Sequence, residues 1–419
     1  MVFTIGVVYF LYVLFKIYIS VMEIGYVNKA KNQDAVILKP SSYMKAARYK
    51  ISSERVEIVS VLADYFLFIF WMGYGLNWLD NLITIKDTAL KTVVFIDAFI
   101  IINYFATLPF SVYKTFVLDK KFGFSNMSVK LFLSDMIKSG IIFLTFGSLI
   151  IWIIAKIMLS FSNWWILGFL FLFAVVVFIN MIYPTLIAPI FNKFTLLKDE
   201  ELRESIEKLM EKAGLKSEGV YTIDASKRDN RLNAYFGGLG KSKRVVLYDT
   251  LVKKLDKKEL LSVLGHELGH FKHKDIYKNI FITAMMLFVM FAIFGNLPQS
   301  IFEAFKIPNT PYGVMSIFLL LSPIVTFLLM PFIGLVSRKN EFEADEYGAE
   351  SGSKRDLATA LMKLAEENKS FPRSHPLYIF FYYTHPPLIE RLKRLGYDFE
   401  NENRDEALEG SCEHIKKEI

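Results

Sequence analysis

Two histidines and a glutamate in the run His266-Glu267-Leu268-Gly269-His270 have the residue types and spacing of a metal-hydrolase site. On a helix, residues i and i+4 share a face, so both imidazoles can bind one Zn²⁺ ion. Glu267 then lies beside the ion, where its carboxylate can accept a proton from a water molecule. Because a catalytic zinc site has three protein ligands and one open position, a third ligand is expected elsewhere in the chain.

The third ligand is expected after the last apolar stretch, where Glu341 and Asp345 are four residues apart and share a helix face. We choose Glu341 as the ligand. Asp345 is expected to accept a hydrogen bond from a ligand imidazole and so fix its tautomer. His273 lies near the same face as the histidine pair and could compete with Glu341, although its lysine neighbours favour a surface position. Without the histidine pair, this acidic cluster would be interpreted as a solvated helix face.

Composition identifies the class of protein. Of the 419 residues, 53% are hydrophobic and 16% aromatic, whereas soluble domains have about 45–50% apolar residues. Mean hydropathy is positive, at +0.34. A membrane-spanning helix needs about 17–25 mostly apolar residues, and the sequence has seven such stretches, at residues 2–22, 58–79, 92–112, 140–159, 164–187, 276–294 and 313–336. They predict a multi-pass integral membrane protein.

The net charge of +7 could indicate nucleic-acid binding, but the basic residues are distributed by loop, which favours a membrane protein without a nucleic-acid partner. Loop 23–56 has seven Lys or Arg residues and loop 113–139 has five, whereas loop 80–91 has two, loop 160–163 has none and loop 297–312 has one. Because cytosolic loops are rich in Lys and Arg, this alternation places the N-terminus outside. The histidine pair and Glu341 then face the cytosol.

The two ends of the chain carry further predictions. The first basic residue is Lys16, so residues 2–22 are expected to be a retained first span rather than a cleavable signal peptide. The single cysteine, Cys412, excludes an intrachain disulfide and is expected to lie in an exposed tail.

We expect five regions along the chain: residues 1–191 with spans one to five, 192–275 as a zinc-binding domain, 276–336 with spans six and seven, 337–397 completing the zinc site, and a charged, disordered tail at 398–419. Periodicity and turn residues predict the local elements of the two non-membrane blocks. These are helices at 199–213, 257–273 and 357–366, a short helix ending at Gly396, strands at 219–223, 233–236 and 244–248, and a turn at 237–240.

Five further runs follow one another along the sequence. They are Leu-Asp-Lys-Lys-Phe-Gly-Phe-Ser at 118–125, Tyr-Pro-Thr-Leu-Ile-Ala-Pro at 183–189, Asn-Ala-Tyr-Phe at 233–236, the Arg338, Glu341 and Ala344-Asp345 run, and His-Pro-Pro with Glu-Arg-Leu at 385–392. Together with the His-Glu-x-x-His pattern and seven spans, they cover nearly the whole chain. The sequence therefore resembles the type I CAAX prenyl proteases, membrane gluzincins of the a-factor-converting endoprotease type.

The resemblance implies roles for matching residues. His266, His270 and Glu341 match the zinc ligands, for one Zn²⁺ per chain, and Glu267 matches the general base. The run Asn233-Ala234-Tyr235 matches an edge strand that pairs with the substrate backbone, which is a physically sound way to hold a peptide extended. Taken alone, Asn233 would be interpreted as a turn residue.

Two more residues acquire roles through the resemblance. His385 and Arg391 match groups that bind substrate and stabilise the oxyanion, and such a donor typically contributes several kcal/mol to transition-state stabilisation. Taken alone, His385 would be interpreted as a cap before a helix that begins with proline.

The resemblance also implies the fold class: an all-α polytopic membrane protein, in which seven transmembrane helices form a ring or barrel around a chamber, with a gluzincin-like α+β zinc protease domain. Lys16, Asp64, Asp97 and Lys156 lie within apolar spans, where charges are costly unless they face protein or water. A water-filled chamber would accommodate them. Those nearer the span ends could instead extend to the membrane interface.

The predicted function is therefore an integral membrane zinc metalloendopeptidase that cleaves peptides near a C-terminus, with CAAX processing implied by resemblance. Its partners would be a peptide or protein substrate, prenylated or not, and the lipid bilayer. A prokaryotic member would lie in the cell membrane and a eukaryotic one in the endoplasmic reticulum membrane. The alternatives are a membrane quality-control metalloprotease, which seven spans disfavour, a zinc transporter or sensor, which would be expected to hold ligands within its spans, and a scaffold.

Overall fold

Seven helices long and apolar enough to cross a bilayer dominate the computed structural model, which describes residues 1–237, 242–397 and 399. Each of the seven predicted stretches lies within one of them, so the seven-span prediction is confirmed. They are α1 (Val2–Ala30); α2 (Pro40–Phe70), η1 (Trp71–Gly75) and α3 (Leu76–Leu82); α4 (Thr88–Tyr113), η2 (Lys114–Leu118) and α5 (Asp119–Lys121); α6 (Val129–Ile142), η3 (Phe143–Gly147) and α7 (Ser148–Ser160); α8 (Trp164–Ile182), η4 (Tyr183–Ile187) and α9 (Ala188–Phe191); α13 (Asp275–Phe294); and α15 (Pro311–Ser351).

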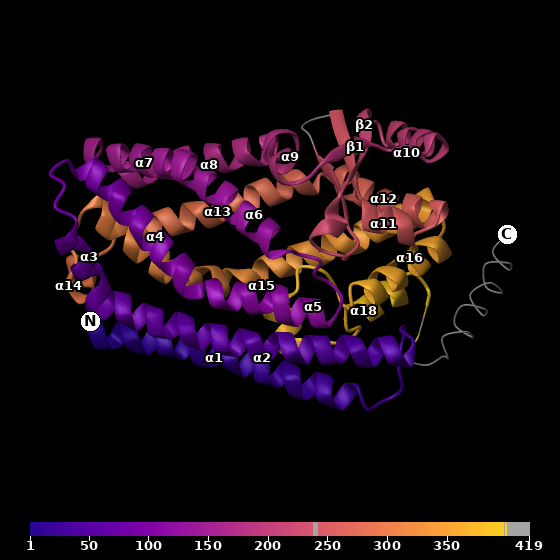
Figure 1. Cartoon of the computed structure of the whole chain (residues 1–419), viewed down its shortest axis with the longest axis horizontal. Helices are drawn as coiled ribbons and strands as arrows, with labels where there is room; N and C mark the ends of the chain where they lie inside the picture. The colour runs from indigo at the N-terminus through magenta and orange to yellow at the C-terminus, as the bar shows by residue number, and fades with distance from the viewer. Residues whose placement is uncertain (238–241, 398, 400–419) are drawn as a thin grey trace.

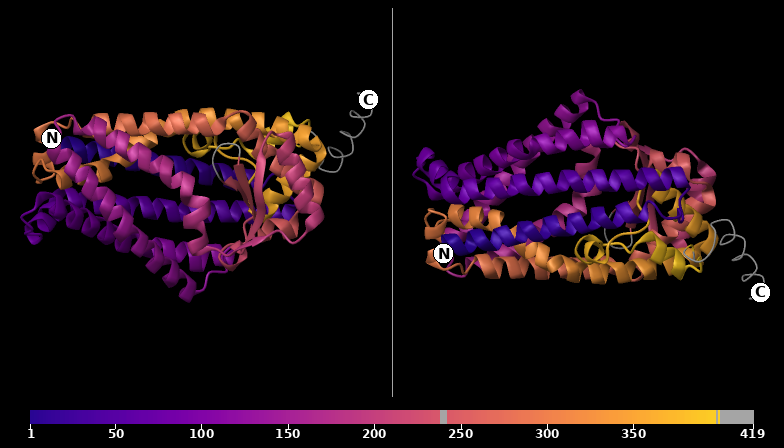
Figure 2. Two further views of the ribbon diagram at one scale, coloured as in Figure 1. Left: turned by 90° about the horizontal axis from the view of Figure 1, so that it is seen from above. Right: turned by 90° about the horizontal axis from the view of Figure 1, so that it is seen from below.

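The spans form a ring (Figure 1). Successive contacts join α1 to α2, α2 to α4, α4 to α7, α7 to α8, α8 to α13 and α13 to α15. The ring closes where Phe327 of α15 packs edge-on against Tyr12 of α1, with ring centroids 5.5 Å apart, and also against Phe15. The two views in Figure 2 show that the sheet and its helices sit at one end of this ring.

The four charged residues within the spans have different surroundings. Lys16 Nζ lies 3.3 Å from a carboxylate oxygen of Glu57. Lys16 and Asp64 line a cavity of about 450 Å³ between α1, α2, α4 and α15. Asp97 accepts a hydrogen bond from Ser148 at 2.7 Å, and the Lys156 ammonium lies 5.7 Å from the centre of a Trp152 ring. Two of the four therefore line a cavity between the spans, as expected for charged side chains that are costly to expose to lipid.

A four-stranded sheet lies beyond the spans in the order β1-β2-β4-β3, formed by β1 (Phe194–Leu196), β2 (Lys216–Ile223), β4 (Ser242–Tyr248) and β3 (Ala234–Gly237). β2 and β4 are parallel, and the other two pairs are antiparallel. The three predicted strands are present. β1 was not predicted, because three residues are too few for a periodicity. Of the predicted turn at 237–240, residues 238–240 lie outside the described residues.

Three helices lie beside the sheet: α10 (Glu200–Lys212) and α12 (Lys257–Lys272) pack against its strands, and α16 (Lys354–Glu367) packs against α12. Their apolar faces share a core with the sheet, in which Val245, Leu264 and Leu268 are fully buried. Asp256 and Glu259 cap the start of α12 reciprocally, which satisfies amide groups that would otherwise lack partners. The predicted helices at 199–213, 257–273 and 357–366 correspond to these three elements.

Helix α15 continues through the boundary predicted at residues 336 and 337 and ends at Ser351. The segment carrying Glu341 is thus a rigid extension of the seventh span. Shorter helices complete the described chain: α11 (Asp249–Lys254), α14 (Gln299–Ala304), α17 (Pro376–Tyr382), α18 (Leu388–Arg394) and a 3₁₀ turn at Ala225–Lys227. α17 was not predicted, and the tail predicted to be disordered lies, apart from Phe399, outside the described residues.

Glycines bring α12 and α15 unusually close. A Cβ atom on Gly269 of α12 would lie 2.8 Å from the Cα of Ala344, and one on Gly348 of α15 would lie 2.9 Å from the backbone nitrogen of His266. Contacts below 3.0 Å essentially never occur for real Cβ atoms. Only residues without a side chain allow this separation, which sets how far Glu341 lies from the histidine pair.

We predict that Gly348→Ala forces the two backbones apart and destabilises the protein by about 1–3 kcal/mol, the usual cost of overpacking. Thermal unfolding of the detergent-solubilised protein would measure the change. Gly25→Ala is the matched control, because a Cβ there meets nothing within 4 Å and alanine favours the helix. Equal unfolding temperatures for the two variants would contradict the packing argument.

Candidate metal centre

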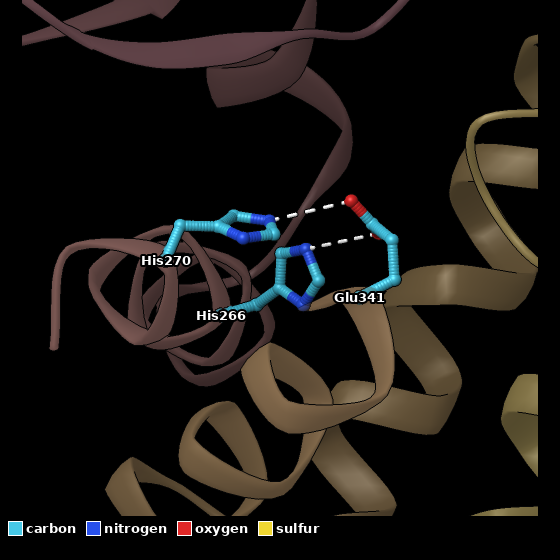
Figure 3. A group of neighbouring side chains, drawn as sticks. All are labelled: His266, His270 and Glu341. Carbon is cyan, nitrogen blue, oxygen red and sulfur yellow. Dashed lines mark ion pairs between the residues drawn. The ribbon is translucent and has the colours of Figure 1, made fainter. Parts of the chain in front are cut away.

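The predicted ligand residues converge from two helices. His266 and His270 lie one turn apart on α12, and Glu341 projects toward them from α15 (Figure 3). One ligand atom from each residue lies within 4.8 Å of the others. The His266 Nε2 is 3.5 Å from Glu341 Oε2, and the His270 Nε2 is 3.3 Å from Glu341 Oε1. A single ion placed between these atoms could contact all three side chains.

The hydrogen bonds of the two imidazoles prepare them for a cation. The Nδ1 of His266 lies 2.8 Å from Asp345, and the Nδ1 of His270 lies 2.9 Å from Asp275. When each Nδ1–H donates to its carboxylate, each Nε2 presents a lone pair toward Glu341. Lone pairs cannot donate to a carboxylate, and the buried Glu341 Oε2 has no hydrogen-bond partner. Two nitrogens and one carboxylate form a donor set that zinc accepts, so the residues fit the ion.

Electrostatics at the pair also favours positive charge. Burial by itself lowers the pKa of His270, but the hydrogen-bonded carboxylates of Glu341 and Asp275 outweigh it and raise the pKa to about 9. A proton held this firmly occupies the place where a divalent cation would satisfy the same carboxylates. The surrounding carboxylates therefore favour positive charge at this position, which suits a metal ion.

Arg391 of α18 reaches the same cluster. Its Nε and Nη2 donate to the two carboxylate oxygens of Asp345, at 2.8 and 2.6 Å. Burial lowers the pKa of Arg391, but the bonds to Asp345 and the charge of Glu341 raise it above its ordinary value. Arg391 therefore stays charged and holds Asp345, which in turn holds His266. Its remaining Nη1 lies 3.6 Å from Glu341 Oε2.

Asp275 is a residue of the site that the sequence analysis missed. It is buried at the start of α13, directly after Lys274, whose backbone has a φ of 58°. Lys278 donates to it at 2.7 Å and also to Asn340 at 3.0 Å. Asp275 lies five positions after His270, beyond the end of α12, so no helical period connects them. The one available signal was an acidic residue at the boundary between the histidine helix and the next span.

The other predicted catalytic residues lie around the cluster. Glu267 is half-buried on α12, and its charge acts on both His270 and Arg391. The largely exposed His385 has its Nε2 3.3 Å from Glu341 Oε1. Arg338 of α15 positions the segment before His385 by donating to the carbonyl oxygen of Tyr383 at 2.5 Å. The exposed side of the cluster is thus the side of His385.

His273 does not join the group. Among the described residues, the cluster of potential metal ligands contains only His266, His270 and Glu341. The ring of His273 faces Tyr347 with centroids 6.5 Å apart, and its buried Nδ1 has no hydrogen-bond partner. The fold therefore brings Glu341, and not His273, beside the histidine pair.

Strand β3, the predicted substrate strand, is the last strand of the described sheet and has β4 as its neighbour. Ala234 and Tyr235 pair with Leu247 and Val246. The side-chain oxygen of Asn233 accepts a hydrogen bond from the amide of Ala234 at 2.9 Å, just before the strand begins. The side of β3 away from β4 therefore has no strand neighbour within the described sheet.

The run at 118–125 anchors the segment that enters β3. The guanidinium of Arg231 donates to Tyr49 at 2.8 Å and to Asp119 at 3.2 Å, and it stacks 3.9 Å from the centre of the Phe124 ring. The amide of Asn230 donates to the carbonyl of Phe124 at 2.9 Å. The run at 118–125, singled out in the sequence without a role, thereby connects the membrane ring to the edge strand.

Comparisons with known proteins agree with this geometry. Residues 196–398 match the model of peptidase family M48, and residues 29–193 match that of the CAAX prenyl protease N-terminal region with five membrane helices. CAAX prenyl protease 1 of Saccharomyces cerevisiae is 32% identical over 87% of this chain and 86% of its own length. The CAAX prenyl protease 1 homolog of Homo sapiens is 34% identical over 69% and 70%.

A solved structure is similar over almost the whole length. The crystal structure of S. mikatae Ste24p has a TM-score of 0.85 and 29% sequence identity, covering 94% of this chain and 98% of that one. The overall fold of the chain is therefore shared with that structure.

We predict that Asp275→Asn weakens metal binding by about 10–100-fold, because the amide no longer fixes the tautomer and basicity of His270. Competition with a zinc chelator would measure the affinity. Glu343→Gln is the matched control, since Glu343 also contacts Lys278, at 3.6 Å, but forms no hydrogen bond or ion pair with either histidine within the described part of the chain. Wild-type affinity in Asp275→Asn would show that His270 does not depend on this bond.

Proposed function

The chain belongs to peptidase family M48 as a membrane zinc metalloprotease of the CAAX prenyl protease type, and from this premise we propose that it cleaves proteins near a prenylated C-terminal cysteine on the cytosolic side of the membrane. The proposal rests chiefly on one observation. His266, His270 and Glu341 converge at the cytosolic end of the ring predicted by the loop charges, beside Glu267.

In this proposal His266, His270 and Glu341 hold the zinc ion. Zinc, when bound, polarises the scissile carbonyl and lowers the pKa of a water molecule. Asp345 and Asp275 keep the Nδ1 protons of the two imidazoles, so that both Nε2 atoms remain available as ligands. Arg391 acts through Asp345, because two of its nitrogens are engaged there.

Proton transfer falls to Glu267. Its carboxylate accepts the proton of the attacking water and then delivers it to the nitrogen of the leaving amine, so that one residue acts first as base and then as acid. His385, with its exposed imidazole 3.3 Å from Glu341, donates to the developing oxyanion, and the Nη1 of Arg391, which lies 3.6 Å from the same carboxylate, adds positive charge beside it.

The substrate binds as an added strand along β3. Main-chain hydrogen bonds to Ala234 and Tyr235 hold the peptide extended, which presents successive carbonyl groups at a fixed spacing. Arg231 and its partners in the 118–125 run fix the direction in which β3 enters the site. A C-terminal peptide has a free end and can enter such a site without the unfolding of a whole domain.

Two candidate functions outside CAAX processing are weaker. A quality-control metalloprotease would use the same zinc site, but the relatives that match over 87% and 69% of the chain carry the CAAX prenyl protease name. Clearance of damaged membrane peptides stays a second candidate for a prokaryotic chain, which would lack prenylated substrates. A transporter would need its ligands within the spans, whereas both histidines lie on α12, outside the seven spans.

We predict that Glu267→Gln retains zinc but cleaves a farnesylated CAAX reporter peptide about 10²–10⁴-fold more slowly, the usual contribution of a general base. Product analysis by mass spectrometry and metal analysis of the same sample would measure both effects. Glu341→Ala should instead lose zinc. Undiminished turnover by Glu267→Gln would exclude this residue as the base.

For orientation, we predict that loop 297–312 is outside and α10 is in the cytosol. The experiment uses a Cys412→Ser background with single cysteines at the exposed positions Asn309→Cys and Lys208→Cys. A membrane-impermeant thiol reagent added to intact cells should label only the first. Labelling of only the second would invert the topology.

A further inference from the structure

A basic pocket of about 570 Å³ lies where the end of α1, the first half of α2 and the end of α5 meet. Its lining includes polar and apolar groups such as Asn28, Ser52 and Phe122. None of its lining side chains is acidic, and five are basic: Lys31, Lys45, Arg48, Arg55 and Lys121. The proposed peptidase reaction uses none of these five.

The pocket follows one face of α2. Lys45, Arg48, Ser52 and Arg55 recur at intervals of three and four residues, the spacing that brings side chains onto one helix face. Lys50 has a different environment. Its Nζ lies 3.2 Å from Glu54 and 3.7 Å from Glu23. On α2, Lys50 is thus paired with carboxylates, whereas Lys45, Arg48 and Arg55 line the pocket.

The five positive charges are not compensated within the described residues. No Asp or Glu oxygen there lies within 4.0 Å of Lys45, Arg48, Arg55 or Lys121, and Lys31 donates only to the neutral Asn28, at 2.7 Å. Like charges one helical turn apart destabilise a helix. A bound anion would offset this repulsion and stabilise the arrangement.

The pKa of the neighbouring Lys369 is affected by the same excess of positive charge. Burial, and next the charge of Lys45, lower the pKa of Lys369 to about 8. The charge of Lys45 therefore extends its effect beyond the pocket wall instead of being neutralised locally.

The depth of the pocket indicates the source of the anion. The apolar part of α2 begins near residue 58, so Arg55 lies about 4.5 Å and Arg48 about 15 Å beyond it at 1.5 Å per residue. The headgroup layer is about 5–8 Å thick on each side of the hydrocarbon. The end of the pocket at Arg55 is therefore at headgroup level. The long Arg and Lys side chains farther from the hydrocarbon can extend toward the same level.

We propose that this basic pocket binds the phosphate of an anionic phospholipid headgroup, with Arg48, Arg55 and Lys121 as the principal cationic contacts. Arginine suits the task because its planar guanidinium forms paired hydrogen bonds to phosphate oxygens. The proposal does not rest on the proposed function or on which leaflet the pocket faces. A competing occupant is the chain's own tail, since residues 400–419 contain seven acidic and three basic residues.

The experiment titrates a fluorescent phosphatidylglycerol into the full-length protein in neutral detergent, with the matching phosphatidylcholine as the uncharged probe. The double variant Arg48→Gln/Arg55→Gln removes two charges from the pocket. Lys29→Gln/Lys39→Gln removes two charges from the same loop at exposed positions that do not line the pocket. Because each cation near a lipid surface contributes about fivefold to binding, the pocket variant should bind phosphatidylglycerol at least about tenfold more weakly. Peptidase activity provides a folding check on both variants.

Selective loss in the pocket variant, with the control unchanged, supports the proposal. Equal weakening in both variants overturns it, because only general surface charge would then be responsible. Displacement of the lipid by inorganic phosphate at equal concentration would assign the pocket to a free anion instead. A severalfold gain in affinity after truncation at Phe399 would assign it to the tail and likewise overturn the lipid assignment.

Discussion

The close contact between α12 and α15 is the constraint on which the site depends. Gly269 and Gly348 leave no room for a side chain between the helices, so Glu341 comes within 3.5 Å of both imidazole Nε2 atoms. A carboxylate facing two nitrogen lone pairs at this distance is unfavourable without a cation. Backbone packing therefore brings together groups that repel one another, and a metal ion bound between them would remove this repulsion.

Hydrogen bonds from the two imidazoles to neighbouring carboxylates orient the rings toward Glu341. Asp345 and Asp275 each accept from one imidazole, although they come from different spans, α15 and α13. Arg391 adds a third element by binding Asp345 through two nitrogens. Three separate segments thus fix the tautomers of two histidines. Because α13 and α15 are also members of the membrane ring, the geometry of the ring and that of the metal centre are coupled.

The ring and the substrate strand are likewise connected. Arg231 binds Tyr49 of α2 and Asp119 of α5, just before β3 begins. The run at 118–125, which the sequence offered as a motif without a mechanism, acts here as an anchor. The nearby basic pocket uses other faces of the same helices. One end of the membrane ring therefore supports the sheet, the metal centre and a separate positively charged surface.

Local pattern alone determined the seven spans, three of the four strands and the histidine helix, because hydropathy and periodicity act within one segment. It also placed Glu341 and Asp345 on one helix face. Tertiary structure decided contacts that no helical spacing encodes: Asp275 as partner of His270 beyond the end of α12, and, between segments far apart in sequence, Arg391 bound to Asp345 and five cations around one pocket. Their side chains meet only after the helices pack, and no spacing along the chain encodes that distance.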